Sequence, residues 1–139
     1  MKRPILVDTG PLLALFDARD EYHHWTCDQF STIEAPLLTC EAVLTEASFL
    51  CLRRLGDSES LLRLVDLGAA QLAFALDENW IQVRTLLRRY ASVPMSLADA
   101  CLVRMSELME DCSILTLDSD FKIYRRHGRK VISLISPLT

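Results

Sequence analysis

Short apolar runs that alternate with helical segments are the feature that most constrains the fold of this chain. Five runs of strand length cover residues 3–8, 36–40, 71–76, 112–117 and 130–135. Segments with helical spacing of apolar residues separate them, beginning near residues 11, 21, 41, 57, 77 and 96. Strands that alternate with helices form βαβ units, whose right-handed crossovers place parallel strands in one covered sheet. We therefore expect an α/β fold with a mostly parallel central sheet of four to five strands.

The length and composition of the chain favour one globular domain. It has 139 residues, half of them hydrophobic, which is enough material for one buried core. We expect a single domain over residues 1–139. The longest apolar runs are about six residues, far below the roughly 20 residues that cross a bilayer, and the start lacks the pattern of a signal peptide. The sequence thus predicts a cytoplasmic protein without a membrane span.

Neither the cysteines nor the histidines predict a metal site. The five cysteines form an odd set without a Cys-x-x-Cys pair, which argues against a disulfide framework and against a thiolate zinc site. Four of them lie in apolar segments, where a free thiol behaves as a small hydrophobe. His23 and His24 are adjacent, so on a helix they point about 100° apart and cannot share a metal. We expect packing or surface roles for both types of residue.

Two of the predicted strands end on an acid. ILVD ends on Asp8, and ILTLD ends on Asp118. Ligand sites in open parallel sheets lie beyond the carboxyl ends of the strands, which is where these acids are expected. Each acid also has a structural alternative, because Asp8 can cap the helix that contains Pro11 and Asp118 can form an Asx-turn. Asp120 is more readily structural, and whether it joins a site stays open.

Two further acids lie in predicted helices. Glu46 interrupts an otherwise apolar face of the helix 41–55, so we expect its carboxylate to be partly buried or to border a cleft. The alternative is an edge residue whose carboxylate extends to water or pairs with Arg53. Asp99 completes the capping-box pattern Ser96-x-x-Asp99 ahead of an apolar run. Its position on the helical wheel also turns it toward the core side, so capping and a site role are compatible.

These acids together predict a metal centre. Strand ends and helix starts meet at one edge of a doubly wound sheet, and four carboxylates in one pocket would repel one another unless a cation neutralised them. Carboxylates without histidine or cysteine suit Mg²⁺ or Mn²⁺ better than zinc. A metal in such a site supports phosphodiester hydrolysis by activating water and stabilising the leaving oxygen. The candidate metal ligands and catalytic residues are Asp8, Glu46, Asp99 and Asp118.

The overall charge requires that any nucleic-acid contact be local. The chain has 19 acidic and 15 basic residues and a net charge of −4, which disfavours attraction of a polyanion by a global field. Two basic groups could hold phosphates or could simply form solvated surface: Arg84, Arg88 and Arg89, and then Lys122, Arg125, Arg126, His127, Arg129 and Lys130.

The order of the acids resembles the PIN-domain family, in particular its small single-domain VapC-type toxins. The resemblance covers essentially the whole chain and rests on ILVDTGPLLALFD, TEASFL, SLADACLV and ILTLDSDF. It implies a PIN-like α/β/α sandwich and Mg²⁺- or Mn²⁺-dependent cleavage of RNA by Asp8, Glu46, Asp99 and Asp118. Thr9 and Thr116 would have supporting roles. Cys101 departs from the commoner family pattern, which is a minor change in the core.

The resemblance also implies partners. It suggests the toxin of a type II toxin–antitoxin pair, an endoribonuclease with an RNA substrate and an antitoxin that blocks the acidic pocket. Exposed parts of the apolar segments 22–30 and 61–67 could form a homodimer surface or a groove for a partner peptide. The alternatives are a standalone PIN nuclease and a non-catalytic module that binds RNA or protein. A phosphohydrolase with Asp8 as nucleophile is weaker, because such enzymes usually carry a second acid where Gly10 stands.

Overall fold

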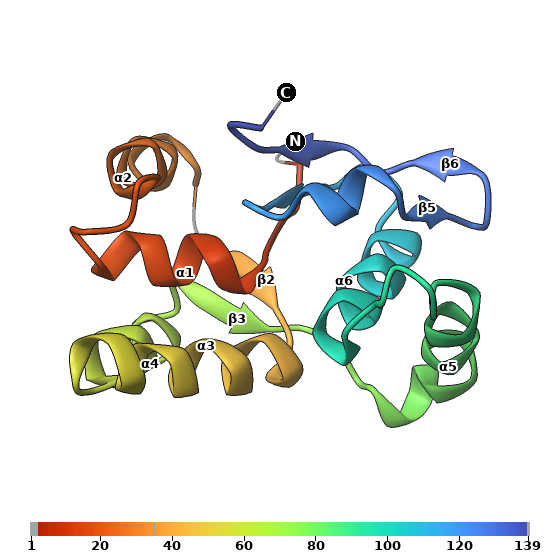
Figure 1. Cartoon of the computed structure of the whole chain (residues 1–139), viewed down its shortest axis with the longest axis horizontal. Coiled ribbons are helices and arrows are strands. Elements are labelled where there is room, and N and C mark those ends of the chain that lie inside the picture. Colours follow the sequence, from red (N-terminus) through yellow and green to blue (C-terminus); the bar gives the residue numbers. More distant parts are fainter. Residues whose placement is uncertain (1–2, 35, 139) are drawn as a thin grey trace.

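A central sheet of five parallel strands organises the chain (Figure 1). The structure is a computed structural model that describes residues 3–34 and 36–138, so residues 1, 2, 35 and 139 lie outside it. The strand order is β3-β2-β1-β4-β7, and every neighbouring pair is parallel. The strands are β1 (Ile5–Val7), β2 (Leu37–Thr39), β3 (Ala70–Leu72), β4 (Ser113–Leu115) and β7 (Leu134–Ile135).

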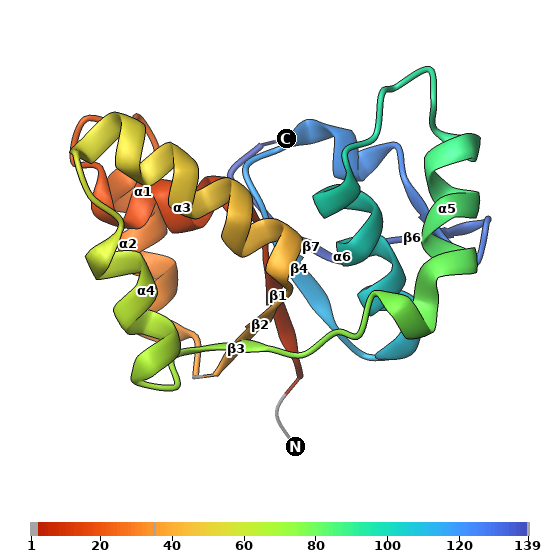
Figure 2. The same ribbon diagram turned by 90° about the horizontal axis from the view of Figure 1, so that it is seen from below.

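Helices cover both faces of this sheet. In the described part of the chain they are α1 (Thr9–Phe16), α2 (His23–Thr32), α3 (Glu41–Leu55), α4 (Glu59–Asp66), α5 (Trp80–Arg89) and α6 (Leu97–Leu108). The chain steps from β1 to β2 to β3 and then returns past β1 to β4. Right-handed crossovers therefore place α1–α4 on one face and α5–α6 on the other, as Figures 1 and 2 show. This confirms the predicted α/β/α fold with a parallel sheet.

The direction of the crossovers reverses between β1 and β4, which are direct neighbours. Leu6 pairs with Ile114 in the register of these strands. Beyond their carboxyl ends the backbone N–H of Asp8 donates to the carbonyl of Leu115 at 3.0 Å. Open α/β sheets bind ligands at such a reversal point. The topology thus places the segments after β1 and β4 side by side, where a ligand site is expected.

The strands beside this point are buried on both faces. Leu6, Val7, Ile114 and Leu115 are fully inaccessible to solvent, as expected for continuous apolar runs in a parallel sheet. Burying one such side chain contributes roughly 1.5–3 kcal/mol to folding. The strand ends that carry Asp8 and Asp118 are therefore held by a rigid core, which fixes the positions of the backbone at the site.

Local signals set the ends of α3 and α6 as predicted. α3 ends before Gly56, whose φ of 87° lies in the left-handed region that glycine adopts without a Cβ penalty. α6 begins after Ser96, whose hydroxyl accepts a hydrogen bond from the backbone N–H of Asp99 at 3.0 Å. The capping role predicted for Ser96 is confirmed, and it orients the first turn of the helix that carries Asp99.

Two predicted strands differ from the structure. The run 130–135 is divided, because β6 (Lys130–Val131) pairs antiparallel with β5 (Arg125–Arg126) in a separate hairpin, and β7 alone joins the main sheet. The positive φ values of His127 and Gly128 form the hairpin turn. The run 71–76 begins as β3 at Ala70 and leaves the sheet after Leu72, before the 3-10 turn η1 (Asp77–Asn79). Apolar sequence alone did not reveal these pairing partners.

The cysteines and His23 have packing roles. Cys40, Cys51, Cys101 and Cys112 are buried, and all five cysteines are free thiols, as predicted. A ring nitrogen of His23 lies 2.6 Å from the carbonyl oxygen of Ala14. Within the described residues, every helix is too short or too polar to cross a membrane.

Candidate metal centre

A pocket of about 530 Å³ opens beyond the carboxyl ends of β1 and β4. Three parts of the chain supply its polar walls: the start of α1, the start of α6 and the loop after β4 that leads into the 3-10 turn η2 (Ser119–Lys122). α3 contributes one side chain to the rim. The lining includes each residue predicted for the site, namely Asp8, Glu46, Asp99 and Asp118, and also Asp120.

Three of these acids form a close cluster. One carboxylate oxygen each from Asp8, Asp99 and Asp118 lie within 4.8 Å of one another. Asp8 and Asp99 are buried, with 5% and 8% of their surfaces exposed, and Asp118 is half-buried. Oxygen donors without sulfur or imidazole suit a hard divalent cation. We call these three residues the acidic cluster, and they could bind a metal ion.

The electrostatics of the acidic cluster also favour a cation. Burial is the largest cause that raises the pKa of Asp8, from the ordinary 3.8 to about 7, with smaller contributions from the charges of Asp99 and Asp118. Burial likewise raises the pKa of Asp99 to about 6, and Asp118 again adds to the effect. Charged carboxylates in this pocket lack full solvation and a neighbouring positive charge. A bound cation would supply both and lower these pKa values.

Hydrogen bonds hold the Asp8 carboxylate on both oxygens. Its Oδ1 accepts from the backbone N–H of Thr9 at 2.7 Å, and its Oδ2 accepts from the hydroxyl of Thr116 at 2.8 Å. The Thr116 hydroxyl accepts in turn from the backbone N–H of Asp118 at 3.0 Å. Asp8 therefore caps α1, as the alternative interpretation predicted, and also faces the pocket. Thr116 connects the first and last acids of the cluster.

Asp99 is held by a residue that the sequence did not point to. Its Oδ2 accepts a hydrogen bond of 2.9 Å from the hydroxyl of Tyr124, whose side chain is fully buried. Burial and the charge of Asp99 raise the pKa of the Tyr124 phenol above its ordinary value. Tyr124 lies just past η2 and outside any strand or helix, so neither helical nor strand periodicity could have indicated its direction.

Asp118 and Asp120 share a turn. The carboxylate of Asp118 accepts from the backbone N–H of Asp120 at 2.9 Å and caps η2, which confirms the predicted Asx-turn. Asp118 nevertheless reaches the acidic cluster. Asp120 lines the same pocket and is half-buried. The turn thus serves to direct the Asp118 side chain into the pocket.

Glu46 borders the pocket from α3 without entering the close cluster. The side chain is exposed, which excludes a partly buried carboxylate and fits both the border of a cleft and an edge residue that extends to water. Arg53, the alternative partner of Glu46, places its guanidinium 5.7 Å from the ring centre of Phe49. Phe49 is itself 57% exposed, because α3 buries only one of its faces. Glu46 lies near the edge between that buried face and solvent.

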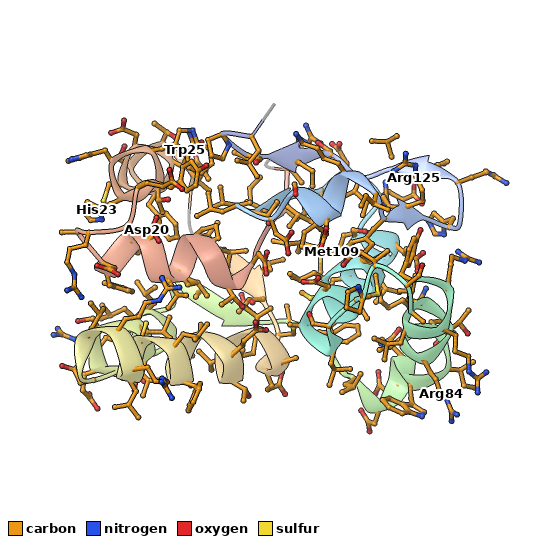
Figure 3. The ribbon with its side chains drawn as sticks, in the orientation of Figure 1. Asp20, His23, Trp25, Arg84, Met109 and Arg125 are labelled. Carbon is orange, nitrogen blue, oxygen red and sulfur yellow. The ribbon has the colours of Figure 1, made fainter. Side chains whose placement is uncertain are left out.

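The predicted basic groups lie on the side of the molecule formed by α5, β5 and β6. Figure 3 shows Arg84 on α5 and Arg125 on β5 there, far from Asp20 and His23 at the opposite end. Arg84, Arg88 and Arg89 are exposed, as are Lys122, His127, Arg129 and Lys130. Arg125 differs, because its Nη1 donates to the carbonyl of Lys122 at 2.7 Å and to two more carbonyls of the same turn. Its guanidinium is therefore engaged in holding the chain after η2.

The fold and the site define an α/β protein with a carboxylate cluster at the reversal point of a parallel sheet. The family model described as the PIN domain matches residues 5–126, and the chain belongs to the PIN-domain family. Ribonuclease VapC26 of Mycobacterium tuberculosis is 30% identical over 125 residues, which are 88% of this chain and 88% of that protein. The resemblance predicted from the order of the acids is thereby confirmed.

A solved structure shares the fold. The crystal structure of VapC20 of Mycobacterium tuberculosis, described as a toxin that cleaves the sarcin-ricin loop, superposes with a TM-score of 0.76. The alignment covers 86% of this chain and 93% of VapC20 at 21% sequence identity. The chain is therefore a PIN-domain protein with the architecture of VapC20 and a distant relationship to VapC ribonucleases.

Proposed function

We propose that the protein is a metal-dependent endoribonuclease that hydrolyses phosphodiester bonds of RNA. The observation that carries this proposal is the acidic cluster, in which oxygens of Asp8, Asp99 and Asp118 lie within 4.8 Å of one another at the reversal point of the sheet. The relationship to ribonuclease VapC26 supports the choice of RNA as substrate. The proposed active site comprises Asp8, Glu46, Asp99 and Asp118 in one domain that extends over residues 1–139.

The acidic cluster would hold Mg²⁺ or Mn²⁺, and its donor set fits these ions. When bound, such a cation supplies a more acidic water and stabilises the charge on the leaving oxygen. The chain itself contributes orientation: Thr9 N–H and Thr116 hold Asp8, and the Asx-turn directs Asp118. These bonds fix the carboxylates before a ligand arrives, which reduces the reorganisation needed during reaction.

Glu46 would act from the rim of the same pocket. Its exposed carboxylate lies where water and substrate enter, and there it can accept a proton or a hydrogen bond from a water molecule. We assign it to the site at a position outside the close cluster, in contact with the cation through water.

The exposed basic residues near α5 and the β5–β6 hairpin would hold the RNA backbone. The pocket itself is acidic and repels phosphates in the absence of a cation, so attraction of the substrate must come from its surroundings. Arg84, Arg88, Arg129 and Lys130 are exposed and available for phosphate contacts. Each such contact makes binding weaker as the salt concentration rises.

We further propose that the protein is the toxin of a type II toxin–antitoxin pair and acts in the cytoplasm. The similarity to VapC proteins in sequence and fold supports this assignment. In this proposal an antitoxin covers the acidic pocket and the chain forms a homodimer through exposed apolar residues of its helices. Co-expression with the gene next to its own, followed by co-purification and inhibition of cleavage, tests the toxin assignment separately from the nuclease assignment.

The experiment that tests the nuclease is a cleavage assay with purified protein and a structured RNA. Mn²⁺ or Mg²⁺ should permit cleavage, and EDTA should stop it. Asp8→Asn and Asp99→Asn should abolish cleavage, whereas Asp66→Asn, at an exposed position on α4, should leave it unchanged. If Asp8→Asn and Asp99→Asn cleave as well as the wild type, the assigned site is wrong. Absence of cleavage by the wild type, together with tight metal-independent RNA binding that these variants leave unchanged, would favour a non-catalytic binding module.

A further inference from the structure

Tyr124 makes an unusual contact for a core aromatic residue. Its side chain is fully buried, and its hydroxyl donates a 2.9 Å hydrogen bond to Oδ2 of Asp99, a member of the acidic cluster. A buried tyrosine needs a partner for its hydroxyl. Here the partner is a carboxylate of the proposed metal centre.

The ring of Tyr124 is fixed by aromatic neighbours. Phe121 packs against it edge to face, with ring centres 5.2 Å apart and planes at 85°. Tyr90 packs on it at 5.0 Å with planes at 65°. The hydroxyl of Tyr90 accepts from the backbone N–H of Arg125 at 2.9 Å, which holds the chain directly after Tyr124. The Tyr124 hydroxyl is therefore presented to Asp99 from a rigid frame.

Asp8 and Asp99 are supported in parallel ways. Each is buried, and each accepts a hydrogen bond from a hydroxyl group supplied by the polypeptide after α6: Thr116 for Asp8 and Tyr124 for Asp99. A carboxylate on a rotatable side chain can turn its oxygens away from its neighbours. A donor on Oδ2 of Asp99 restricts that rotation and leaves Oδ1, together with a remaining lone pair of Oδ2, for another ligand.

We propose that Tyr124 is a positioning residue that orients the Asp99 carboxylate toward Asp8 and Asp118, so that the three can bind one divalent cation. The inference rests on the proposed metal site and adds a residue that holds one of its ligands in place. Hydrogen bonds to metal-ligating groups commonly change metal affinity by about 10- to 100-fold when they are removed. A tyrosine with only a packing role would leave metal affinity unchanged when its hydroxyl is lost.

The test is the affinity of the full chain for Mn²⁺, measured by electron paramagnetic resonance of the free ion. Tyr124→Phe keeps the ring and its aromatic packing and removes only the hydroxyl. We expect it to bind Mn²⁺ about 10-fold more weakly than the wild type. Tyr22→Phe is the matched control, since it removes the hydroxyl of a tyrosine that directly precedes α2 and does not line the pocket of the acidic cluster. It should bind Mn²⁺ within about twofold of the wild type, below the smallest effect expected of a supporting hydrogen bond.

Asp99→Ala separates failure of the positioning role from failure of the metal site. If Asp99→Ala binds Mn²⁺ as tightly as the wild type, the metal site itself is wrong. If Asp99→Ala weakens binding but Tyr124→Phe equals the wild type, the positioning role alone is overturned. In the double variant Asp99→Ala/Tyr124→Phe, the loss of the hydroxyl should add nothing, because its partner is gone.

A second measurement does not depend on the stability of Tyr124→Phe. The chain contains three tyrosines, so 3-fluorotyrosine gives three ¹⁹F resonances, and Tyr22→Phe and Tyr90→Phe assign the third to Tyr124. Saturating Mg²⁺ should shift the Tyr124 resonance more than the other two. A Tyr124 resonance that stays in place while Mg²⁺ binds would overturn the proposal.

Discussion

The acidic cluster and the basic β5–β6 hairpin differ in almost every physical respect. The cluster is buried or half-buried, extends from the ends of β1 and β4 and the start of α6, and is held by hydrogen bonds from distant segments. The hairpin is a short antiparallel ribbon apart from the main sheet, and its basic side chains from His127 to Lys130 are exposed. Electrostatic effects are strong where water is excluded and are screened by salt at the surface. In the proposed function, chemistry is therefore assigned to the first region and attraction of the substrate to the second.

The largest expected effect is the loss of RNA cleavage when an acid of the cluster is replaced. Asp8→Asn or Asp99→Asn should lower RNA cleavage by about 10³-fold, because a catalytic metal contributes several kcal/mol to the transition state. RNA binding, measured by fluorescence anisotropy, should stay close to that of the wild type. Asp66→Asn serves as the control with the same chemical change at an exposed position. A large loss of RNA binding in Asp8→Asn would contradict this division of roles.

The next effect concerns stability. Mn²⁺ at 100 times its Kd should raise the free energy of unfolding by about 2.7 kcal/mol, since the cation binds the folded state. Urea denaturation with and without Mn²⁺ measures this difference. Asp99→Asn should remove most of it, whereas Lys130→Ala in the hairpin should retain it. Equal stabilisation of Asp99→Asn and the wild type would indicate that Mn²⁺ binds elsewhere.

The pH should affect the acidic cluster. The pKa of Asp8 is about 7 in the folded protein against an ordinary 3.8, so the folded state binds this proton more tightly than the unfolded state. Without metal, the stabilising contribution of Asp8 is present at low pH and is lost as the pH rises through 7. Metal affinity should instead rise with pH, since the cation competes with the protons of Asp8 and Asp99.

Calorimetry across pH 6 to 7 should show Mn²⁺ affinity rising by about tenfold, given one proton displaced from a carboxyl of pKa about 7 and another from one of pKa about 6. Asp8→Asn should flatten this dependence. Without metal, the wild type should unfold more readily at pH 8 than at pH 5. A stability without metal that rises over this range would show that the acids are not the groups that titrate.

The smallest effect belongs to the hairpin. Arg129→Ala combined with Lys130→Ala should weaken RNA binding by a few fold. It should also reduce the slope of log K against log salt by about 1.4 for single-stranded RNA, if each residue contacts one phosphate. The cleavage rate at saturating RNA should be unchanged. Glu59→Ala/Asp66→Ala, which removes two exposed charges from α4, is the control.

The sequence predicted the parts of the molecule that local rules determine. Continuous apolar runs identified β1 and β4, and the acids at their ends were assigned to one site because parallel strands share a carboxyl edge. The span of α3 was predicted from its apolar pattern and Gly56. These features depend on neighbours in sequence or on one topological rule.

The remaining features depend on contacts between distant segments. The hydrogen bond from Tyr124 to Asp99 arises from the path of the chain after η2, which no periodic pattern describes. The division of residues 130–135 between two sheets depends on β5 and β4 as partners. The exposure of Glu46 reflects how α3 sits against the core. Each requires knowledge of the packing that the apolar pattern alone does not contain.

The central claim is that the acidic cluster binds one catalytic divalent cation. The most direct measurement is a crystal structure of the protein soaked with Mn²⁺, with anomalous differences recorded near the manganese absorption edge. We predict one strong peak within ligand distance of Asp8, Asp99 and Asp118, and no such peak in Asp99→Asn crystals soaked in the same way. An empty cluster at a Mn²⁺ concentration that supports RNA cleavage would contradict the account.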